Sequence, residues 1–154
     1  MRYFFILALS LNFLYMNSQE NLPFYEISNY PESYSEAEIV GRMIDGLGFR
    51  YHWATEGLTE EDLNFRLPND SRSSIETIGH IYDLSNMILN TALNTPVEKK
   101  SIEGIEFKEI RKKTLFNLKE ASDIFKKTKN FDDYSIVFIR NSKKVEYPFW
   151  NQLN

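Results

Sequence analysis

Two segments decide the fold, SEAEIVGRMIDGLGFRYHWATEGL at residues 35–58 and SRSSIETIGHIYDLSNMILNTAL at residues 71–93. Each contains a serine followed three residues later by a glutamate, Ser35 with Glu38 and Ser73 with Glu76. In this arrangement, called a capping box, each side chain accepts a hydrogen bond from a free backbone N–H of the first helical turn. The sequence therefore predicts a helix in each segment, beginning at these serines.

Apolar residues recur every three or four positions in both segments, as they do along one side of an α-helix. The stripe of the first segment is Val40, Met43, Ile44, Leu47, Tyr51, Ala54 and Leu58. The second segment has a main stripe of Ile75, Ile78, Tyr82, Leu89 and Leu93, with further apolar residues on other sides. A helix that is apolar around most of its surface lies inside a bundle, with neighbours on several sides.

A third helix is predicted over residues 105–128, where Phe107, Ile110, Thr114, Leu118, Ala121 and Phe125 keep the same spacing. After it, β-branched and aromatic residues at 134–139 and 145–147 flank a turn at 141–144, which indicates a small β-hairpin. Residues 20–34 and 59–70 lack this periodicity and contain prolines, so we expect an ordered lead-in and a loop. The fold class expected from these patterns is all-α, an up-and-down bundle of three long helices with a small hairpin.

Residues 1–19 have the layout of a secretory signal peptide. Arg2 precedes an apolar run from Tyr3 to Met16, and short polar residues follow. A run of this length is typical of a signal-peptide core and short for a membrane-spanning helix. We expect cleavage and a periplasmic or secreted domain of residues 20–154; the alternative is an uncleaved anchor, the only link to a membrane that the sequence suggests. A domain without cysteine suits a bacterial periplasm better than a disulfide-stabilised extracellular module.

The charge of the chain argues against nucleic acid as a partner. There are 22 acidic and 18 basic residues, for a formal net charge of −4. After residue 19, basic residues are in excess only at 94–129, where they number 10 against 6 acids, whereas residues 20–93 hold 13 acids and 4 bases. A nucleic-acid-binding domain usually shows a basic face and a high pI. We attribute the uneven charge to one basic helix packing beside two acidic ones.

The chain has two histidines, and His80 in the second helix is the candidate for chemistry. His80 and Asp83 are three residues apart, so both side chains project on one side of a helix. The pair could bind a metal, with the carboxylate orienting the imidazole, or it could be part of a solvated polar strip. His52 lies away from the apolar stripe of its helix and is expected at the surface. No HExxH, GxSxG, phosphate-binding loop or dinucleotide-binding fingerprint is present in the sequence.

Residues 36–154 resemble the DinB-like superfamily of metalloenzymes, also called damage-inducible or YfiT-like. The resemblance is carried by GLGFRYHWATEGLTEEDLNFR, SSIETIGHIYDLSNMIL, EFKEIRKKTLFNL and the closing PFWNQLN, in that order. It implies a four-helix bundle that holds a divalent metal such as Zn, Ni or Fe with three histidines. His80 matches the first of these, whereas the other two normally lie in a fourth helix, which this chain lacks or has in truncated form. No histidine follows His80, so tight metal binding is not expected.

Two functions are therefore open. One is an exported helical bundle without a complete metal site, acting as a binding module or an inactive fragment. It predicts an apolar groove where the fourth helix would lie, filled by a partner helix or by a second copy of the chain. The other is a metal-dependent hydrolase or thiol transferase, with His80 as a ligand and Asp83 as its orienting neighbour.

Overall fold

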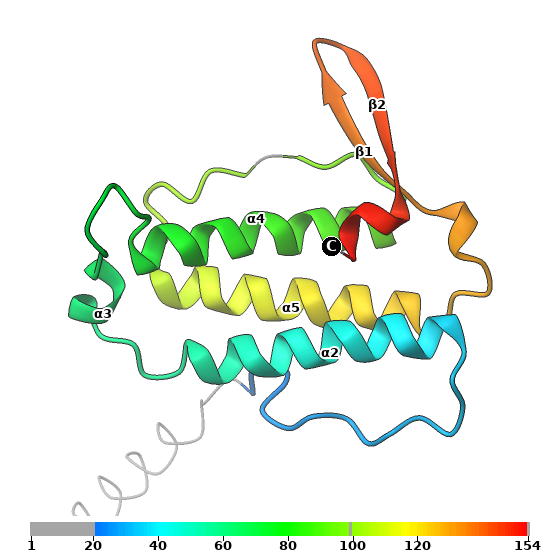
Figure 1. Cartoon of the computed structure of the whole chain (residues 1–154), viewed down its shortest axis with the longest axis horizontal. Coiled ribbons are helices and arrows are strands. Elements are labelled where there is room, and N and C mark those ends of the chain that lie inside the picture. The colour runs from blue at the N-terminus through cyan, green and yellow to red at the C-terminus, as the bar shows by residue number, and fades with distance from the viewer. Residues whose placement is uncertain (1–20, 99, 154) are drawn as a thin grey trace, which may run out of the picture.

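The computed structural model describes residues 21–98 and 100–153, so the predicted signal peptide at residues 1–19 lies outside the described residues. Three helices of 19 residues dominate this part of the chain: α2 (Glu36–Ala54), α4 (Ser74–Ala92) and α5 (Phe107–Phe125). As Figure 1 shows, α5 lies between α2 and α4 and packs against both. None of the helices in the described ranges is both long enough and apolar enough to cross a membrane.

The two capping boxes read from the sequence are present in the structure, at Ser35 with Glu38 and at Ser73 with Glu76. The prediction of a loop at 59–70 is wrong for part of its length. There a short helix, α3 (Glu60–Asn64), begins with a third capping box, formed by Thr59 and Asp62. The sequence contains this capping box, but with aspartate at the third helical position, where glutamate or glutamine is usual.

The all-α fold class is wrong, because the fold is mixed. Strands β1 (Ser135–Arg140) and β2 (Lys143–Pro148) pair antiparallel in a two-stranded sheet, and the Val97 N–H donates to the Val137 carbonyl beside it. Asn141 and Ser142 connect the strands with φ angles of 49° and 60°. Two successive left-handed residues match the right-handed twist of a hairpin. The predicted hairpin is therefore confirmed, and it lies between two short 3-10 helices, η1 (Phe131–Asp133) and η2 (Phe149–Gln152).

The core is built on α5, whose predicted stripe is buried from Ile110 to Phe125, while Phe107 is half-buried. Leu115, Leu118, Ala121 and Phe125 are the fully enclosed residues of its main cluster. Around them are Val40, Ile44 and Tyr51 of α2, Ala92 of α4 and Phe149 of η2. The Phe149 ring meets the Phe125 ring edge to face, with centroids 5.3 Å apart. The segment after the hairpin therefore closes one end of the helix layer.

The lead-in runs along α2 without helix, as the sequence predicts. The Phe24 ring is buried against the backbone of Gly48, where a Cβ atom would lie 2.7 Å from Phe24 Cγ. Further along, Ser28 Oγ donates a hydrogen bond of 2.9 Å to Asp45 Oδ2. One side of α2 is therefore covered by this segment.

Candidate functional site

Among the described residues, the structure does not group His80 and Asp83 with further metal-ligating side chains. His80 is exposed on α4, and Asp83 is half-buried, with Oδ1 buried and lacking a hydrogen-bond partner among the residues that the structure describes. Within residues 21–98 and 100–153, no group of three or more His, Asp or Glu side chains lies close enough to hold an ion. A catalytic metal needs about three protein ligands. His80 and Asp83 alone therefore do not fit a catalytic metal.

The prediction that His52 lies at the surface is wrong, because the lead-in covers it. Its Nδ1 atom lies 2.8 Å from the carbonyl oxygen of Pro23, which can only accept, so Nδ1 carries the proton and donates. Its Nε2 atom lies 3.9 Å from Glu56 Oε2. The Tyr25 ring packs edge-on against the imidazole, with centroids 5.8 Å apart. The periodicity of α2 could not reveal this covering segment, which precedes the helix.

A buried carboxylate, Asp45, joins α2 to α5. It is 2% exposed; Ser122 Oγ donates to Oδ1 at 2.6 Å, and Lys126 Nζ donates to Oδ2 at 2.6 Å. Burial raises the pKa of the Asp45 carboxyl, but the hydrogen bonds from Lys126, Ser122 and Ser28 outweigh burial and leave the pKa below its ordinary value. The absence of a side chain at Gly41 makes room for the Lys126 stem, since a Cβ there would lie 2.8 Å from Lys126 Cε.

A second polar connection joins the other end of α2 to α5. Arg111 is buried, and its Nε donates to Thr55 Oγ1 at 2.9 Å while its Nη2 donates to the His52 carbonyl at 3.0 Å. The same guanidinium pairs with Glu56. The two polar connections fix the rotation of α2 about its own axis, and with it the residues that α2 turns outward.

The outward side of α2 carries a row of apolar side chains. Ile39 is 49% exposed, Met43 51% and Leu47 43%. Glu36 and Arg50, both exposed, continue the row at either end with the same three- and four-residue spacing. We call Glu36, Ile39, Met43, Leu47 and Arg50 the α2 face. The sequence placed Met43 and Leu47 in the core stripe of this helix, but the core is formed by the adjacent positions Val40, Ile44 and Tyr51.

A groove of about 710 Å³ lies beside one end of the α2 face. Glu36, Ile39 and Met43 form one wall, and four aromatic residues, Phe131, Tyr134, Phe149 and Trp150, contribute to the rest of its lining. Trp150 is 74% exposed. The side chain of Gln152 fixes η2 to α4, because its Nε2 donates to Thr91 Oγ1 at 2.6 Å. The aromatic residues of PFWNQLN were visible in the sequence, but their packing beside α2 was not.

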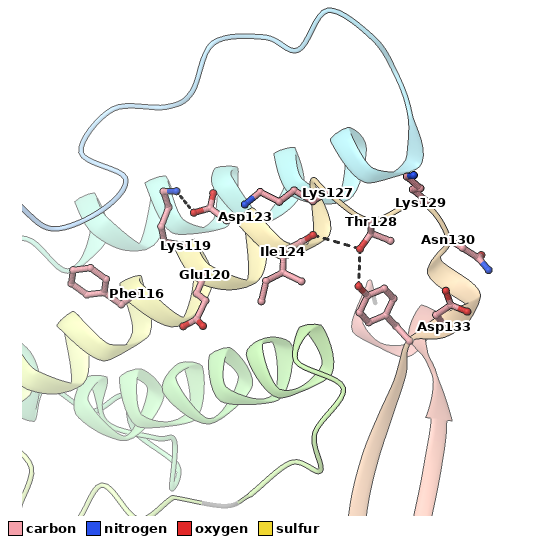
Figure 2. Close-up of a pocket in the computed structure, with 11 residues that line it drawn as sticks. Phe116, Lys119, Glu120, Asp123, Ile124, Lys127, Thr128, Lys129, Asn130 and Asp133 are labelled. Carbon is pink, nitrogen blue, oxygen red and sulfur yellow. Dashed lines mark hydrogen bonds and ion pairs between the residues drawn. The ribbon is translucent and has the colours of Figure 1, made fainter.

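A cleft of about 770 Å³ between the outer side of α5 and η1 is less suited to binding (Figure 2). Its lining mixes three lysines with three acids, and Lys119 is paired with Asp123 (Figure 2). It also lies at the C-terminal end of α5, where the helix dipole is negative and basic side chains are stabilised. The lysines here match that dipole and are not evidence of an anion site.

The α2 face and its groove are therefore the candidate functional site of the described part of the chain. Comparison of the chain with known protein families, curated proteins and solved structures finds no match.

Proposed function

We propose that this chain is a binding module that docks an amphipathic helix on the α2 face and in the groove beside it. The observation that carries the proposal is the row of three half-exposed apolar side chains, Ile39, Met43 and Leu47, next to an aromatic groove. Helix-in-groove recognition uses anchors at this spacing. We also propose that the protein is exported from the cytoplasm and that it is related to the DinB-like superfamily.

Folding does not account for this row of residues. Single exposed apolar side chains are ordinary on protein surfaces, but a contiguous patch marks an interaction site. Covering the exposed half of each of these three side chains stabilises a complex by about 1 kcal/mol per residue. Trp150 adds an aromatic anchor of the kind that dominates binding energies at interfaces.

His80 lies on α4, outside the α2 face, and has no role in the proposed binding. A metal-dependent hydrolase or transferase would need ligands from elsewhere, and no observation on the described residues favours that activity. The α2 face would bind its partner without a cofactor.

The test is a display library of amphipathic helices selected for binding to the purified chain. We expect binders whose affinity falls at least about tenfold for Met43→Glu, because the substitution places a charge in the centre of the apolar row. The matched control is Phe116→Glu on the outer side of α5, where a 43% exposed aromatic side chain lies outside the α2 face. Binders unaffected by Met43→Glu, or equally weakened by Phe116→Glu, would contradict the proposal.

A further inference from the structure

We infer that the helix docking on the α2 face is the same helix of a second copy of this chain, packed antiparallel and centred on Met43. The inference rests on the proposed function and names the partner. It is drawn from the order of residues along the α2 face. When a second, identical helix is placed antiparallel to the first, the apolar residues of one face meet those of the other and each charge meets an opposite charge.

The five residues of the α2 face are symmetric in spacing about Met43. Ile39 and Leu47 lie four residues to either side of it, and Glu36 and Arg50 lie seven residues to either side. A two-fold dimer is formed by one patch meeting itself, so residue i contacts residue j and j contacts i. With two α2 helices antiparallel and Met43 opposite Met43, Ile39 meets Leu47 of the second copy and Glu36 meets Arg50.

The charges at the two ends of the α2 face favour the antiparallel arrangement of the two helices over the parallel one. Glu36 and Arg50 are separated by 14 residues, about 21 Å along the helix, so they act as separate charges at the two ends of the apolar row. In a parallel pair each would lie beside the same charge of the second copy, which is repulsive. In the antiparallel pair both ends form an ion pair, so the dimer contains two.

The free chain leaves these charges available. Among the residues that the structure describes, neither Glu36 nor Arg50 takes part in an ion pair, and Arg50 Nη1 donates only to the Gly46 carbonyl of its own helix, at 3.0 Å. Asp132 lines the groove together with Glu36. An incoming arginine therefore meets two carboxylates. The exposed ring of Trp150, which lines the same groove, offers it a cation–π contact.

The expected dimer is weak. Three half-exposed apolar side chains and an aromatic on each copy fall short of the roughly 800 Å² per partner of a standard stable interface. We therefore expect a monomer–dimer equilibrium that depends on concentration and salt.

The experiment uses two charge variants of the purified chain, Glu36→Arg and Arg50→Glu, measured by sedimentation velocity. In each variant alone, the facing charges are alike at both ends of the row, so dimerisation weakens at least about tenfold relative to the unsubstituted chain. Mixed in equal amounts they restore it, because every arginine then faces a glutamate. The double variant Glu36→Arg/Arg50→Glu restores a homodimer in the same way.

Three results would overturn the inference. They are a chain that stays monomeric up to millimolar concentration, charge variants that dimerise as well as the original, or a mixture no stronger than its components. Both substitutions are at exposed helical positions, and circular dichroism checks the fold. The dimer dissociation of the unsubstituted chain on dilution, compared with that of Met43→Glu, tests the same interface without charge variants. Met43→Glu should dissociate at a higher concentration. A monomeric chain that still binds selected helices through Met43 overturns the second-copy partner and leaves the binding-module function standing.

Discussion

Replacing Asp45 by asparagine should destabilise the fold by about 2–3 kcal/mol at pH 7. The carboxylate is 2% exposed and accepts hydrogen bonds from Ser28, Ser122 and Lys126. Breaking a buried ion pair by removing one partner typically costs about 3–5 kcal/mol. The Lys126 side chain is 34% exposed and recovers part of its hydration, which brings the cost to about 2–3 kcal/mol.

The matched control is Asp123→Asn. Asp123 pairs with Lys119 one turn away on α5, but both side chains are nearly half exposed. Such pairs contribute about 0.3–0.5 kcal/mol. Urea unfolding followed by far-UV circular dichroism should therefore separate the two asparagine variants clearly, with Asp45→Asn unfolding at lower urea and the slope m unchanged.

The pH dependence provides an independent check on the mechanism. Because the pKa of Asp45 is lowered in the folded state, its contribution is fully present above the unfolded pKa, about 3.9, and is lost as the pH falls through the folded value. The stability difference between the original chain and Asp45→Asn should be constant from pH 7 to pH 5 and shrink below about pH 4. A difference that persists undiminished to pH 2, or equals that of Asp123→Asn at pH 7, would refute the reasoning.

Three further substitutions test other parts of the fold. Gly48→Ala places a Cβ atom 2.7 Å from Phe24 Cγ, so it should destabilise the fold by about 1–3 kcal/mol. It should also shift the fluorescence of Trp53, because Trp53 Nε1 donates to the Tyr25 carbonyl of the same lead-in. An unchanged spectrum would contradict this prediction. Ser142→Gly relieves a left-handed residue, with φ of 60°, and should stabilise the hairpin by about 0.5–1 kcal/mol in thermal unfolding, whereas a loss of stability would show that the serine is not strained. Phe149→Ala removes a buried ring packed on Phe125 and should cost about 3–5 kcal/mol in urea unfolding; a cost below 1 kcal/mol would mean that η2 does not close the core.

Local signals in the sequence located the helices well. Ser35 with Glu38 and Ser73 with Glu76 set helix starts through contacts within a single turn, so the two capping boxes could be read directly. The stripe from Ile110 to Phe125 predicted the buried side of α5 for the same reason. The β-branched and aromatic residues on either side of the turn also predicted the hairpin correctly. The fold class was nevertheless predicted as all-α, although the hairpin makes the fold mixed.

Contacts between segments distant in the sequence could not be predicted in this way. His52 is buried because Pro23 and Tyr25 cover it, and nothing in the spacing of α2 encodes a segment that precedes it. The predicted α2 stripe included Met43, Leu47 and Ala54, which the structure leaves exposed. Periodicity gives the apolar arc of a helix but not which part of that arc meets a neighbour. The rotation of α2 is set by Asp45 and Arg111, polar residues that a search for an apolar stripe does not count.

The two sides of α2 together support a binding role. The side toward α5 carries buried polar groups, Asp45 and the turn around Thr55, that must be matched by hydrogen bonds from Ser122, Lys126 and Arg111. Such groups are costly to bury and give a helix a defined orientation when every partner is in place. The orientation they impose buries Val40, Ile44 and Tyr51 and turns Ile39, Met43 and Leu47 toward solvent. The polar contacts therefore hold in a defined orientation the exposed row on which we propose that a helix docks.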